Sequence, residues 1–454
     1  MPWISTQIGS HTLGKTELEI ISRLFLYRSG TAEQVTYMIQ PELANVDRKQ
    51  KTSPYTGRVK YIARKLSELV KKGLCSVFKT THSMKLVYYL SPEGLNCAYT
   101  IHGIEEHVAS LASGWGSDFG YFDYVTYRPP QDRYAHHEIS VTFHIDMMHY
   151  AGKGKYTYSF IDNRYASREF HVLKQGKRVK RYFRPDGEFK LNDSNHFWLE
   201  IDMSTERGER LTEKFESYRD YIDDISEGIS FSQINETPSA ILFHTTANYI
   251  SSRWVSVFNA FMQKMGPYTP LVNFRLTNSE TLEVSARAEV NSDLIVASVK
   301  SNLKFYLSKE SGFVGLPKPG PASSSFVKLM PSDEDILGWS PNIVISTKND
   351  GSSYILLFER MEGYETLGIA RVIDFVRRLD QLDIGKSGQI TEVVPVLYYY
   401  EVAPDDNPYK GGGGEIEMRR IFSKLIIHDA KRNLWFDGND RAPIQTNPLL
   451  HRSH

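Results

Sequence analysis

Cysteine is scarce in this sequence, since the 454 residues include only Cys75 and Cys97. So few cysteines exclude a disulfide framework and a cysteine-rich zinc module, and are typical of proteins in a reducing cytoplasm. Long apolar runs are missing too, so we expect no segment that spans a membrane. The first residues lack the basic stretch and apolar core of a secretory signal, so we expect a cytoplasmic protein.

A net charge is also missing, because 54 Lys and Arg residues balance 54 Asp and Glu residues. The total charge therefore indicates no partner, and the distribution of charge along the chain has to be considered instead. Hydrophobic residues make up 41% of the chain, as in ordinary globular proteins. Because 454 residues exceed what one hydrophobic core usually holds, we expect two or three domains.

Three helices and a hairpin are predicted in the first 100 residues, from apolar residues at the helical period and two strand-like segments around a turn. The helices are expected at 15–27, 31–40 and 56–73, and the strands at 74–80 and 85–91. This is the order of a winged helix-turn-helix, whose third helix enters the major groove of DNA while the hairpin, or wing, rests on the backbone. We therefore predict a DNA-binding domain over residues 12–102.

Basic residues are concentrated in this domain. From Arg48 to Lys85 there are eleven Lys or Arg residues and a single acid, Glu68. Such a cluster attracts DNA phosphates whatever the base sequence. The alternative is a solvated basic helix in a wing that binds protein. The side chains predicted to contact DNA are those of the third helix and the wing: Arg58, Lys60, Arg64, Lys65, Lys79 and Lys85.

The rest of the chain predicts a multidomain α/β protein. A Gly- and aromatic-rich bridge, with a helix near 103–112, forms a predicted linker over residues 103–132. A helix, several strands, a helix, a strand and a helix follow, which is typical of an α/β layered domain with a mixed sheet. We expect this domain at 133–270, a C-terminal α/β domain at 271–440 and a tail at 441–454.

Three acidic residues of the middle domain are predicted to come together. Glu200 and Asp202 alternate along an apolar strand, so their side chains point to the same face. Asp186 begins the preceding strand, and the short turn between the two strands brings it near the other two acids. Three carboxylates at the end of a sheet form an oxygen-ligand site suited to Mg²⁺ or Mn²⁺. The alternative is that Glu200 and Asp202 are ordinary solvent-facing residues of an edge strand.

Lys214 lies on the helix that follows this strand, at the edge of an apolar stripe that includes Leu211, Phe215 and Tyr218. Its side chain is therefore expected to point toward the sheet rather than into bulk solvent. A lysine there could stabilise negative charge on a scissile phosphate.

The order Asp186, then Glu200-x-Asp202, resembles the PD-(D/E)xK nuclease superfamily. Lys214 is similar to the lysine that some branches carry on the neighbouring helix, and Glu138 to the acid that many members carry on the preceding helix. Together with an N-terminal winged helix, the sequence resembles the replication-relaxation family of bacterial plasmid and mobile-element proteins over roughly residues 12 to 262. Because Asp202 stands where the usual motif has lysine, an inactive fold retained for DNA binding is the alternative.

This resemblance implies a restriction-endonuclease-like domain with Asp186, Glu200 and Asp202 as ligands of Mg²⁺ or Mn²⁺, and with Lys214 and Glu138 as further catalytic residues. It implies a protein that binds double-stranded DNA in the replication, mobilisation or maintenance of a plasmid or mobile element. The alternative function is a non-catalytic replication initiator, segregation factor or transcription regulator. A second copy of the chain and other replication or mobilisation proteins are the further partners considered.

Histidines offer a competing interpretation of the middle domain. Four of them are close together on one predicted helix: His136, His137, His144 and His149. Zinc would need several such side chains to converge, and the sequence "HHEIS" lacks the second histidine of the zinc-protease signature. One of these histidines near Glu138 could instead orient a phosphate.

The C-terminal third resembles the middle domain in its layout, with a strand, a turn, a strand, a helix and a buried strand, and then a helix expected at 415–430. Asn342 falls where Asp186 falls, Glu359 where Glu200 falls, and Met361 replaces Asp202. We therefore consider a degenerate nuclease-like repeat that has lost its metal ligands. Residues 312–326, rich in Pro, Gly and Ser, indicate a linker or a long surface loop.

Overall fold

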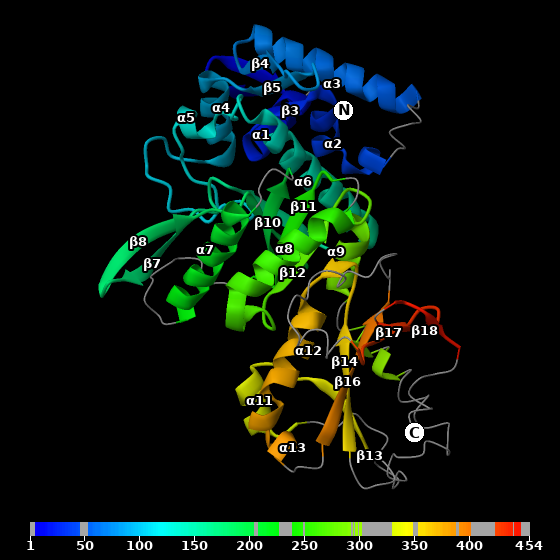
Figure 1. The fold of residues 1–454 in the computed structure, drawn as a ribbon. Coiled ribbons are helices and arrows are strands. Elements are labelled where there is room, and N and C mark those ends of the chain that lie inside the picture. Colours follow the sequence, from blue (N-terminus) through cyan, green and yellow to red (C-terminus); the bar gives the residue numbers. More distant parts are fainter. Residues whose placement is uncertain are drawn as a thin grey trace. The chain divides into compact units, whose positions relative to one another are not determined.

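A computed structural model gives the fold of this α/β protein (Figure 1). It describes residues 5–45, 53–203, 208–226, 238–247, 250–291, 294, 296–297, 299–301, 329–347, 353–386, 390–400, 423–438 and 440–445. The chain divides into two compact units, one formed by residues 1–203 with 227–238 and the other by residues 204–226 with 239–454. Among the helices described, none is long and apolar enough to cross a membrane.

The first unit begins with helices packed around a small sheet of order β3-β5-β4. Its elements are β1 (Ser5–Ile8), β2 (His11–Gly14), α1 (Lys15–Tyr27), β3 (Gly30–Thr31), α2 (Ala32–Ile39), η1 (Pro41–Asn45), α3 (Ser53–Lys71), β4 (Cys75–Lys79), β5 (Leu86–Leu90) and α4 (Pro92–His102). The predicted helices and hairpin are therefore present. Thr31 caps α2, because its hydroxyl accepts a hydrogen bond from the Gln34 amide and its own amide donates to the Gln34 side chain.

The helix expected near 103–112 is wrong, because the helix of this region is α4, which ends at His102. Ser91 caps its start by accepting a hydrogen bond from the Gly94 amide, and Pro92 occupies the first turn, where its missing N–H costs nothing. Gly103 ends the helix in the left-handed conformation, with φ 66°.

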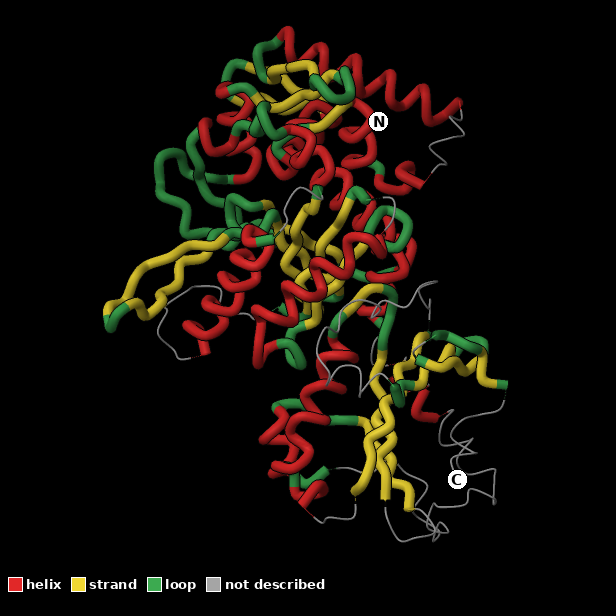
Figure 2. The backbone as a smooth tube through the Cα atoms, viewed as in Figure 1, coloured by secondary structure: helices red, strands yellow, loops and turns green. Residues whose placement is uncertain are grey.

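The rest of the first unit consists of a long helix, three antiparallel strands and a separate two-stranded ribbon. The elements are α5 (Tyr124–Tyr127), α6 (Tyr134–Gly154), β6 (Tyr158–Asp162), β7 (Arg168–Lys174), β8 (Lys177–Phe183), β9 (Gly187–Leu191) and β10 (Asn195–Asp202). Strand β9 pairs with both β6 and β10. The predicted turn after β9 is present, with Asn192 and Asp193 at positive φ. Figure 2 shows β7 and β8 as a ribbon that extends away from the other strands of this unit.

The second unit starts with helices and strands that follow β10 in the sequence: α7 (Glu209–Ser226), β11 (Ala240–Thr245), α8 (Ile250–Met265), η2 (Gly266–Tyr268), β12 (Asn273–Thr277) and α9 (Leu282–Val290). Strands β11 and β12 are parallel, and β15 (Tyr364–Glu365) adds to β12 in the antiparallel direction. Aromatic rings from both helices and both strands fill the space between them. The Phe215 ring lies 5.5 Å from Phe243, 5.4 Å from Phe261 and 5.6 Å from Phe274.

A second sheet of this unit has the order β13-β14-β16-β17-β18-β19. Its strands and the nearby helices are α11 (Pro331–Leu337), β13 (Asn342–Thr347), β14 (Ser353–Arg360), α12 (Leu367–Arg378), η3 (Leu379–Gln381), α13 (Asp383–Lys386), β16 (Ile390–Tyr399), β17 (Ile426–Asp429), β18 (Leu434–Asp437) and β19 (Pro443–Ile444). Strand β14 is antiparallel to β13 and parallel to β16, and β16 is parallel to β17.

The helix expected at 415–430 is wrong over its described part, because Ile426–Asp429 is strand β17. Leu425, Ile426 and Ile427 are all buried, and a short, fully buried apolar run fits a central strand as well as it fits a helix. Residues 415–422, the segment 312–326 and most of the predicted tail lie outside the described residues.

Buried charges connect the two sheets of the second unit. Arg275 of β12 donates to Glu289 of α9 at 2.7 Å and lies 2.7 Å from Glu365 of β15. Arg360 of β14 lies 3.4 Å from Glu289 and 3.6 Å from Glu365. Burial alone would raise the pKa of Glu289, but Arg275 and Arg360 outweigh this effect and lower it. The two arginines and two glutamates therefore compensate one another's charge.

Candidate functional site

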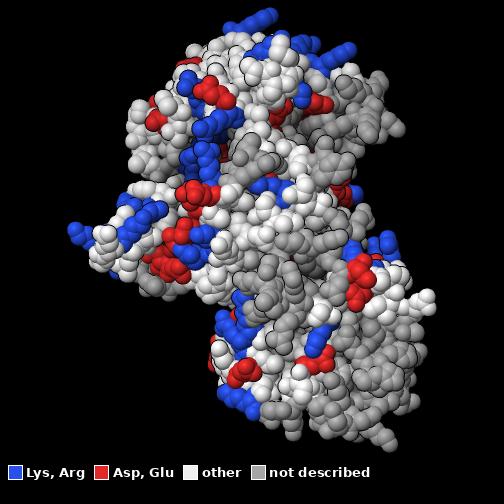
Figure 3. Space-filling view, in the orientation of Figure 1, with Lys and Arg blue, Asp and Glu red and all other residues white. Residues whose placement is uncertain are grey.

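Helix α3 has one buried face and one basic face. Ile62, Leu66 and Leu69 are fully buried against α1 and α2, and this fixes which way the helix is turned. Lys60 and Arg64 are exposed on the other side. Figure 3 shows Lys and Arg side chains gathered over α3. Because the apolar residues of α3 recur at the helical period, they share one buried face, and the basic residues between them lie on the exposed face.

Neighbouring side chains hold several of these cations. The Arg58 and Arg64 guanidinium groups lie 5.2 and 5.4 Å from the centre of the Tyr61 ring. Glu68 lies 3.7 Å from Arg64 and 2.6 Å from Lys65, and its hydrogen bond raises the pKa of Lys65. One carboxylate serves two cations here, so the face remains positive.

The β4–β5 hairpin adds Lys79 and Lys85, both exposed. Glu138, expected as an acid of the middle domain, contacts this hairpin. Its carboxylate lies 2.6 Å from His82 Nε2 and 3.6 Å from Lys85 Nζ. The structure thus places Glu138 as a link between α6 and the hairpin, whereas its catalytic role stays a prediction.

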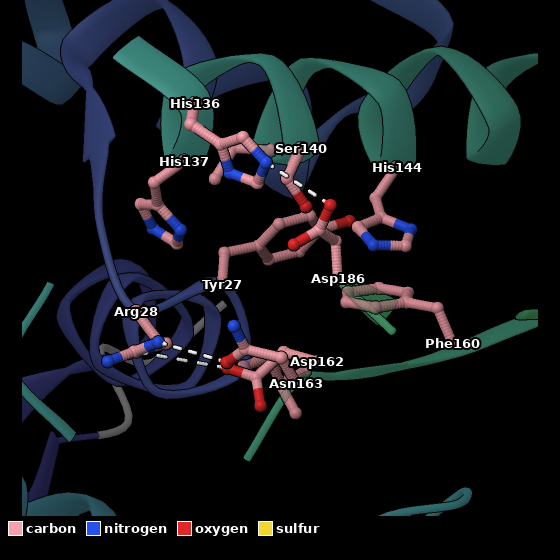
Figure 4. Close-up of a pocket in the computed structure, with 12 residues that line it drawn as sticks. Tyr27, Arg28, His136, His137, Ser140, His144, Phe160, Asp162, Asn163 and Asp186 are labelled. Atoms are coloured by element: carbon pink, nitrogen blue, oxygen red, sulfur yellow. Dashed lines mark hydrogen bonds and ion pairs between the residues drawn. The ribbon is translucent and has the colours of Figure 1, made fainter. Parts of the chain in front are cut away.

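A small cavity of about 30 Å³ lies between α1, α6, β6 and the residue before β9 (Figure 4). A polar cavity of this size can hold a water molecule, for which about 10 to 15 Å³ is enough. Its polar lining comes from the four segments: Arg28, His136, His137, Ser140, His144, Asp162, Asn163 and Asp186. His136, Ser140 and His144 are four residues apart on α6, so they share one face of the helix. We call this cavity the histidine–aspartate pocket.

Of the two histidines that follow, His144 is buried and His137 is half-buried, and both are neutral at pH 7. Burial lowers the pKa of His144 and of His137 to about 3. His144 Nδ1 lies 2.7 Å from the Tyr158 hydroxyl, and its ring stacks on Phe160 with the ring centres 4.1 Å apart. The other ring nitrogen, Nε2, is buried and has no hydrogen-bond partner among the described residues. His137 Nε2 lies 3.0 Å from the Ser29 hydroxyl.

Asp186 connects this pocket to strand β10. One of its carboxylate oxygens accepts a hydrogen bond of 2.9 Å from the Ile201 amide and lies 3.2 Å from His136 Nε2. Ile201 stands between Glu200 and Asp202, so the Asp186 carboxylate meets the strand at the two predicted acidic positions. A carboxylate paired with an imidazole in this way can orient a water molecule or take up a proton.

Glu200 and Asp202 are 2% and 5% exposed, so the alternative that they face solvent on an edge strand is wrong. Leu199 and Ile201 are buried as well, because both faces of β10 are covered. Within the described ranges, no group of three or more His, Cys, Asp or Glu side chains is arranged to hold a metal ion. The assignment of Asp186, Glu200 and Asp202 as metal ligands stays a prediction, and zinc binding by the histidines of α6 stays a competing interpretation.

An ion cluster forms the opposite wall of the pocket. Arg164 donates to both oxygens of Asp162 at 2.8 Å, and Arg28 lies 3.9 Å from the same carboxylate. Burial tends to raise the pKa of Asp162, but Arg164 and Arg28 outweigh it and lower the pKa. Arg28 also donates to the carbonyl oxygens of Thr126, Tyr127 and Arg128, so it fixes the C-terminal end of α5. No sequence pattern predicts this cluster, since Arg28 is far from Asp162 and Arg164 along the chain.

A larger cavity of about 560 Å³ lies on the other side of Arg28 and Asn163. Four arginines line it, namely Arg28, Arg128, Arg164 and Arg184, and Asp132 is the acid in the lining. Arg128 and Arg184 are exposed, whereas Arg28 and Arg164 are tied to Asp162. We call this cavity the arginine cavity.

Lys214 belongs to the second unit, on α7. Its ammonium group lies 5.4 Å from the centre of the Phe243 ring in β11, so the side chain points toward the sheet, as expected. Its role in catalysis stays a prediction.

These features define an α/β protein. Its first unit combines a module of three helices and a hairpin, which has a basic surface, with the histidine–aspartate pocket between α1, α6 and β6. Residues 28–228 match the family model described as Replication-relaxation. The resemblance to the replication-relaxation family is thus confirmed over this part of the chain, which extends from the end of α1 to just beyond α7. No curated protein and no solved structure gives a significant match.

Proposed function

We propose that the protein binds double-stranded DNA through a winged helix-turn-helix formed by α1, α2, α3 and the β4–β5 hairpin. The observation that supports this most directly is the basic face of α3, opposite a fully buried apolar stripe and next to a hairpin with exposed lysines. The family match supports a role in the replication, mobilisation or maintenance of a plasmid or mobile element.

The predicted contacts suit the phosphate backbone. Lys60 and Lys79 are exposed and in no ion pair with any other described residue, so each can approach a phosphate without breaking one. Arg64 is held against Tyr61, which lowers the entropy lost when its guanidinium is fixed on DNA. If all six predicted cations contact phosphates, the logarithm of the binding constant should fall with a slope of about −5 against the logarithm of salt concentration.

The test is the binding of a labelled DNA duplex, followed by fluorescence anisotropy at several salt concentrations. Replacing Lys60 and Arg64 by alanine should weaken binding and reduce the steepness of the salt dependence by about 2. A matched variant, Lys153→Ala with Arg377→Ala, removes two exposed cations elsewhere and should bind like the wild type. Equal affinity and equal slope for the two variants would refute DNA binding by α3.

A second candidate function is metal-dependent nicking of DNA. The observation that favours it is the hydrogen bond of Asp186 to the backbone between Glu200 and Asp202. Carboxylates are the donors that Mg²⁺ and Mn²⁺ prefer, so Asp186, Glu200 and Asp202 would hold such an ion. When bound, the ion would polarise a phosphodiester and activate water. Lys214 would stabilise the developing negative charge, and nicking of supercoiled plasmid DNA in Mg²⁺ or Mn²⁺ tests this activity.

A further inference from the structure

The β7–β8 ribbon forms no part of a larger sheet among the described strands. Seven residue pairs hold it together, from Arg168 opposite Phe183 to Lys174 opposite Lys177. Gln175 and Gly176 form its tip, with φ 52° and 74°. Positive φ at both positions is the signature of a tight two-residue turn that matches the twist of the strands.

The outer half of this ribbon contributes nothing to a hydrophobic core, since all residues of β8 from Lys177 to Tyr182 are exposed. A two-stranded hairpin is only marginally stable in water, so its base must fix it. There the Phe183 ring lies 6.1 Å from Phe170 and 5.2 Å from Trp198. Arg168 forms a buried ion pair with Glu188 at the same end. A ribbon anchored at its base and solvated along its length is built to present its side chains.

Those side chains are strongly basic. Residues 168–184 contain one acid, Glu169, which lies 2.5 Å from Lys180. Six exposed cations accompany it: Lys174, Lys177, Arg178, Lys180, Arg181 and Arg184. Because side chains alternate along a strand, Arg178 and Lys180 lie on one face and Lys177 and Arg181 on the other. Leu173 and Tyr182 are 67% and 62% exposed beside them.

We propose that the β7–β8 ribbon is a second DNA-contacting element, which enters the major groove and places cations against both of its walls. This inference rests on the proposed binding of duplex DNA. The major groove of B-DNA admits a two-stranded β-ribbon, and phosphates line it on both sides. An acidic protein surface would neutralise the cations on one face of the ribbon, whereas the phosphates on both sides of the groove neutralise the cations on both faces. The exposed Leu173 and Tyr182 side chains provide apolar contacts to base edges.

The positive surface continues at the base of the ribbon. Arg184 directly follows β8 and lines the arginine cavity together with Arg128, and both are exposed. Arg128 and Arg184 can hold a phosphate of the DNA strand that borders the groove. The buried Arg28 and Arg164 then stay paired with Asp162. The ribbon therefore provides groove contacts at its outer end and a backbone contact at its base.

The first test compares a ribbon variant, Lys177→Gln with Arg178→Gln and Arg181→Gln, with wild-type protein in the anisotropy assay. Losing three phosphate contacts should reduce the steepness of the salt dependence by about 3 and weaken binding about tenfold or more at low salt. The matched control is Lys153→Gln with Arg377→Gln and Lys431→Gln, which removes the same charge from exposed positions elsewhere. It should bind like the wild type. Thermal unfolding should be unchanged in both variants, because the positions are exposed.

The outcomes separate this inference from the proposed function. If wild-type protein does not bind duplex DNA, the proposed function and this inference both fail. If the Lys60 and Arg64 variant binds weakly while the ribbon variant binds like its control, only the ribbon inference is overturned.

A cross-linking experiment gives a second, independent readout. Both native cysteines are buried, so a cysteine introduced at Leu173 is selectively labelled with a photoactivatable maleimide. Illumination should cross-link this protein to a bound duplex. The same label at Leu434, which is 46% exposed in the second unit, serves as the control and should give no more than background. Equal yields at the two positions would refute a ribbon in contact with DNA.

Discussion

The middle of the chain and its C-terminal third have the same order of helices and strands, but they carry different side chains at equivalent positions. The middle region has the hairpin β9–β10, then α7 and β11, and the C-terminal region has the hairpin β13–β14, then α12 and β16. Both hairpins are antiparallel, and a parallel pair of strands follows in each region, β11 with β12 and β16 with β17. The predicted repeat requires such a sheet at residues 330–435, although the repeat itself stays a prediction.

The difference lies in the charged residues at equivalent places. The middle region has Asp186, Glu200 and Asp202, whereas the C-terminal region has Asn342, Glu359 and Met361. Of these three residues Glu359 is the acid, and it is buried 3.7 Å from Arg371 of α12. Burial raises its pKa to about 7, although Arg371 acts in the opposite direction. One acid paired with one helix-borne cation is a structural contact, so we expect metal chemistry in the middle region alone.

The largest expected effect concerns this contrast. Replacing Asp186 by Asn and Glu200 by Gln should reduce metal-dependent nicking of supercoiled plasmid DNA at least a hundredfold, because two of the three predicted carboxylate ligands are lost. The equivalent change in the C-terminal region, Glu359→Gln, should leave nicking unchanged. Gel electrophoresis of plasmid incubated with Mg²⁺ or Mn²⁺ measures both.

DNA binding by each variant has to be measured alongside, so that loss of nicking is not loss of binding. If wild-type protein nicks and the Asp186 and Glu200 variant nicks equally well, the carboxylate site is not the catalytic site. If no protein nicks while all bind DNA, the non-catalytic alternative is supported.

The next effect concerns the buried charges that join the two sheets within the second unit. Arg275→Ala leaves Glu289 and Glu365 with only Arg360 as a close cation among the described residues. Removing one partner of a buried ionic network is expected to lower the free energy of unfolding by about 3 to 5 kcal/mol. Urea unfolding measures this loss. Arg219→Ala, which breaks contacts on the more exposed surface of α7, should cost less than about 1 kcal/mol, and a similar cost for the two variants would contradict the role of the network.

The sequence predicted those elements whose signals are local. The periodicity of α1, α2 and α3 and the turn at Asn192 and Asp193 each depend on neighbouring residues, and the structure has all of them. Strand β17 was predicted as a helix because a short apolar run fits either structure until its burial decides. The helix expected near 103–112 was misplaced because the caps at Ser91 and Gly103, and not apolar periodicity, set the ends of α4. The burial of both faces of β10 was missed for a similar reason, since alternation reveals only one covered face.

The site was predicted less completely, because tertiary contacts bring distant residues together. Asp186 contacts the Glu200–Asp202 strand at the Ile201 amide, since one turn separates the two strands, while the convergence of the three carboxylates stays a prediction. Arg28 and Asn163, in contrast, are 135 residues apart in the sequence, and their contact follows only from the packing of α1 against β6. The ribbon could have been found from the sequence, because "KQGKRVKRYFR" combines a glycine turn signal with a run of closely spaced cations.

The smallest expected effect is the pH dependence that Glu359 gives to stability. Its pKa is about 7 in the folded chain and 4.5 for an unperturbed glutamate side chain, so the folded state binds more protons between these values. Stability should therefore fall as the pH rises from about 4.5 to about 7, by about 3 kcal/mol at most. Glu359→Gln cannot take up or release the proton and should remove this decline. Urea unfolding of both proteins at pH 5 and pH 8 measures the difference.

The surface variant Glu216→Gln on α7 controls for the loss of one negative charge and should keep the pH profile of the wild type. If Glu359→Gln also keeps that profile, the acid is ionised in the folded chain throughout this range and Arg371 compensates its burial. The Glu359 carboxylate would then be charged, as a metal ligand has to be. The expected lack of metal binding in the C-terminal region would have to be attributed to Asn342 and Met361 alone.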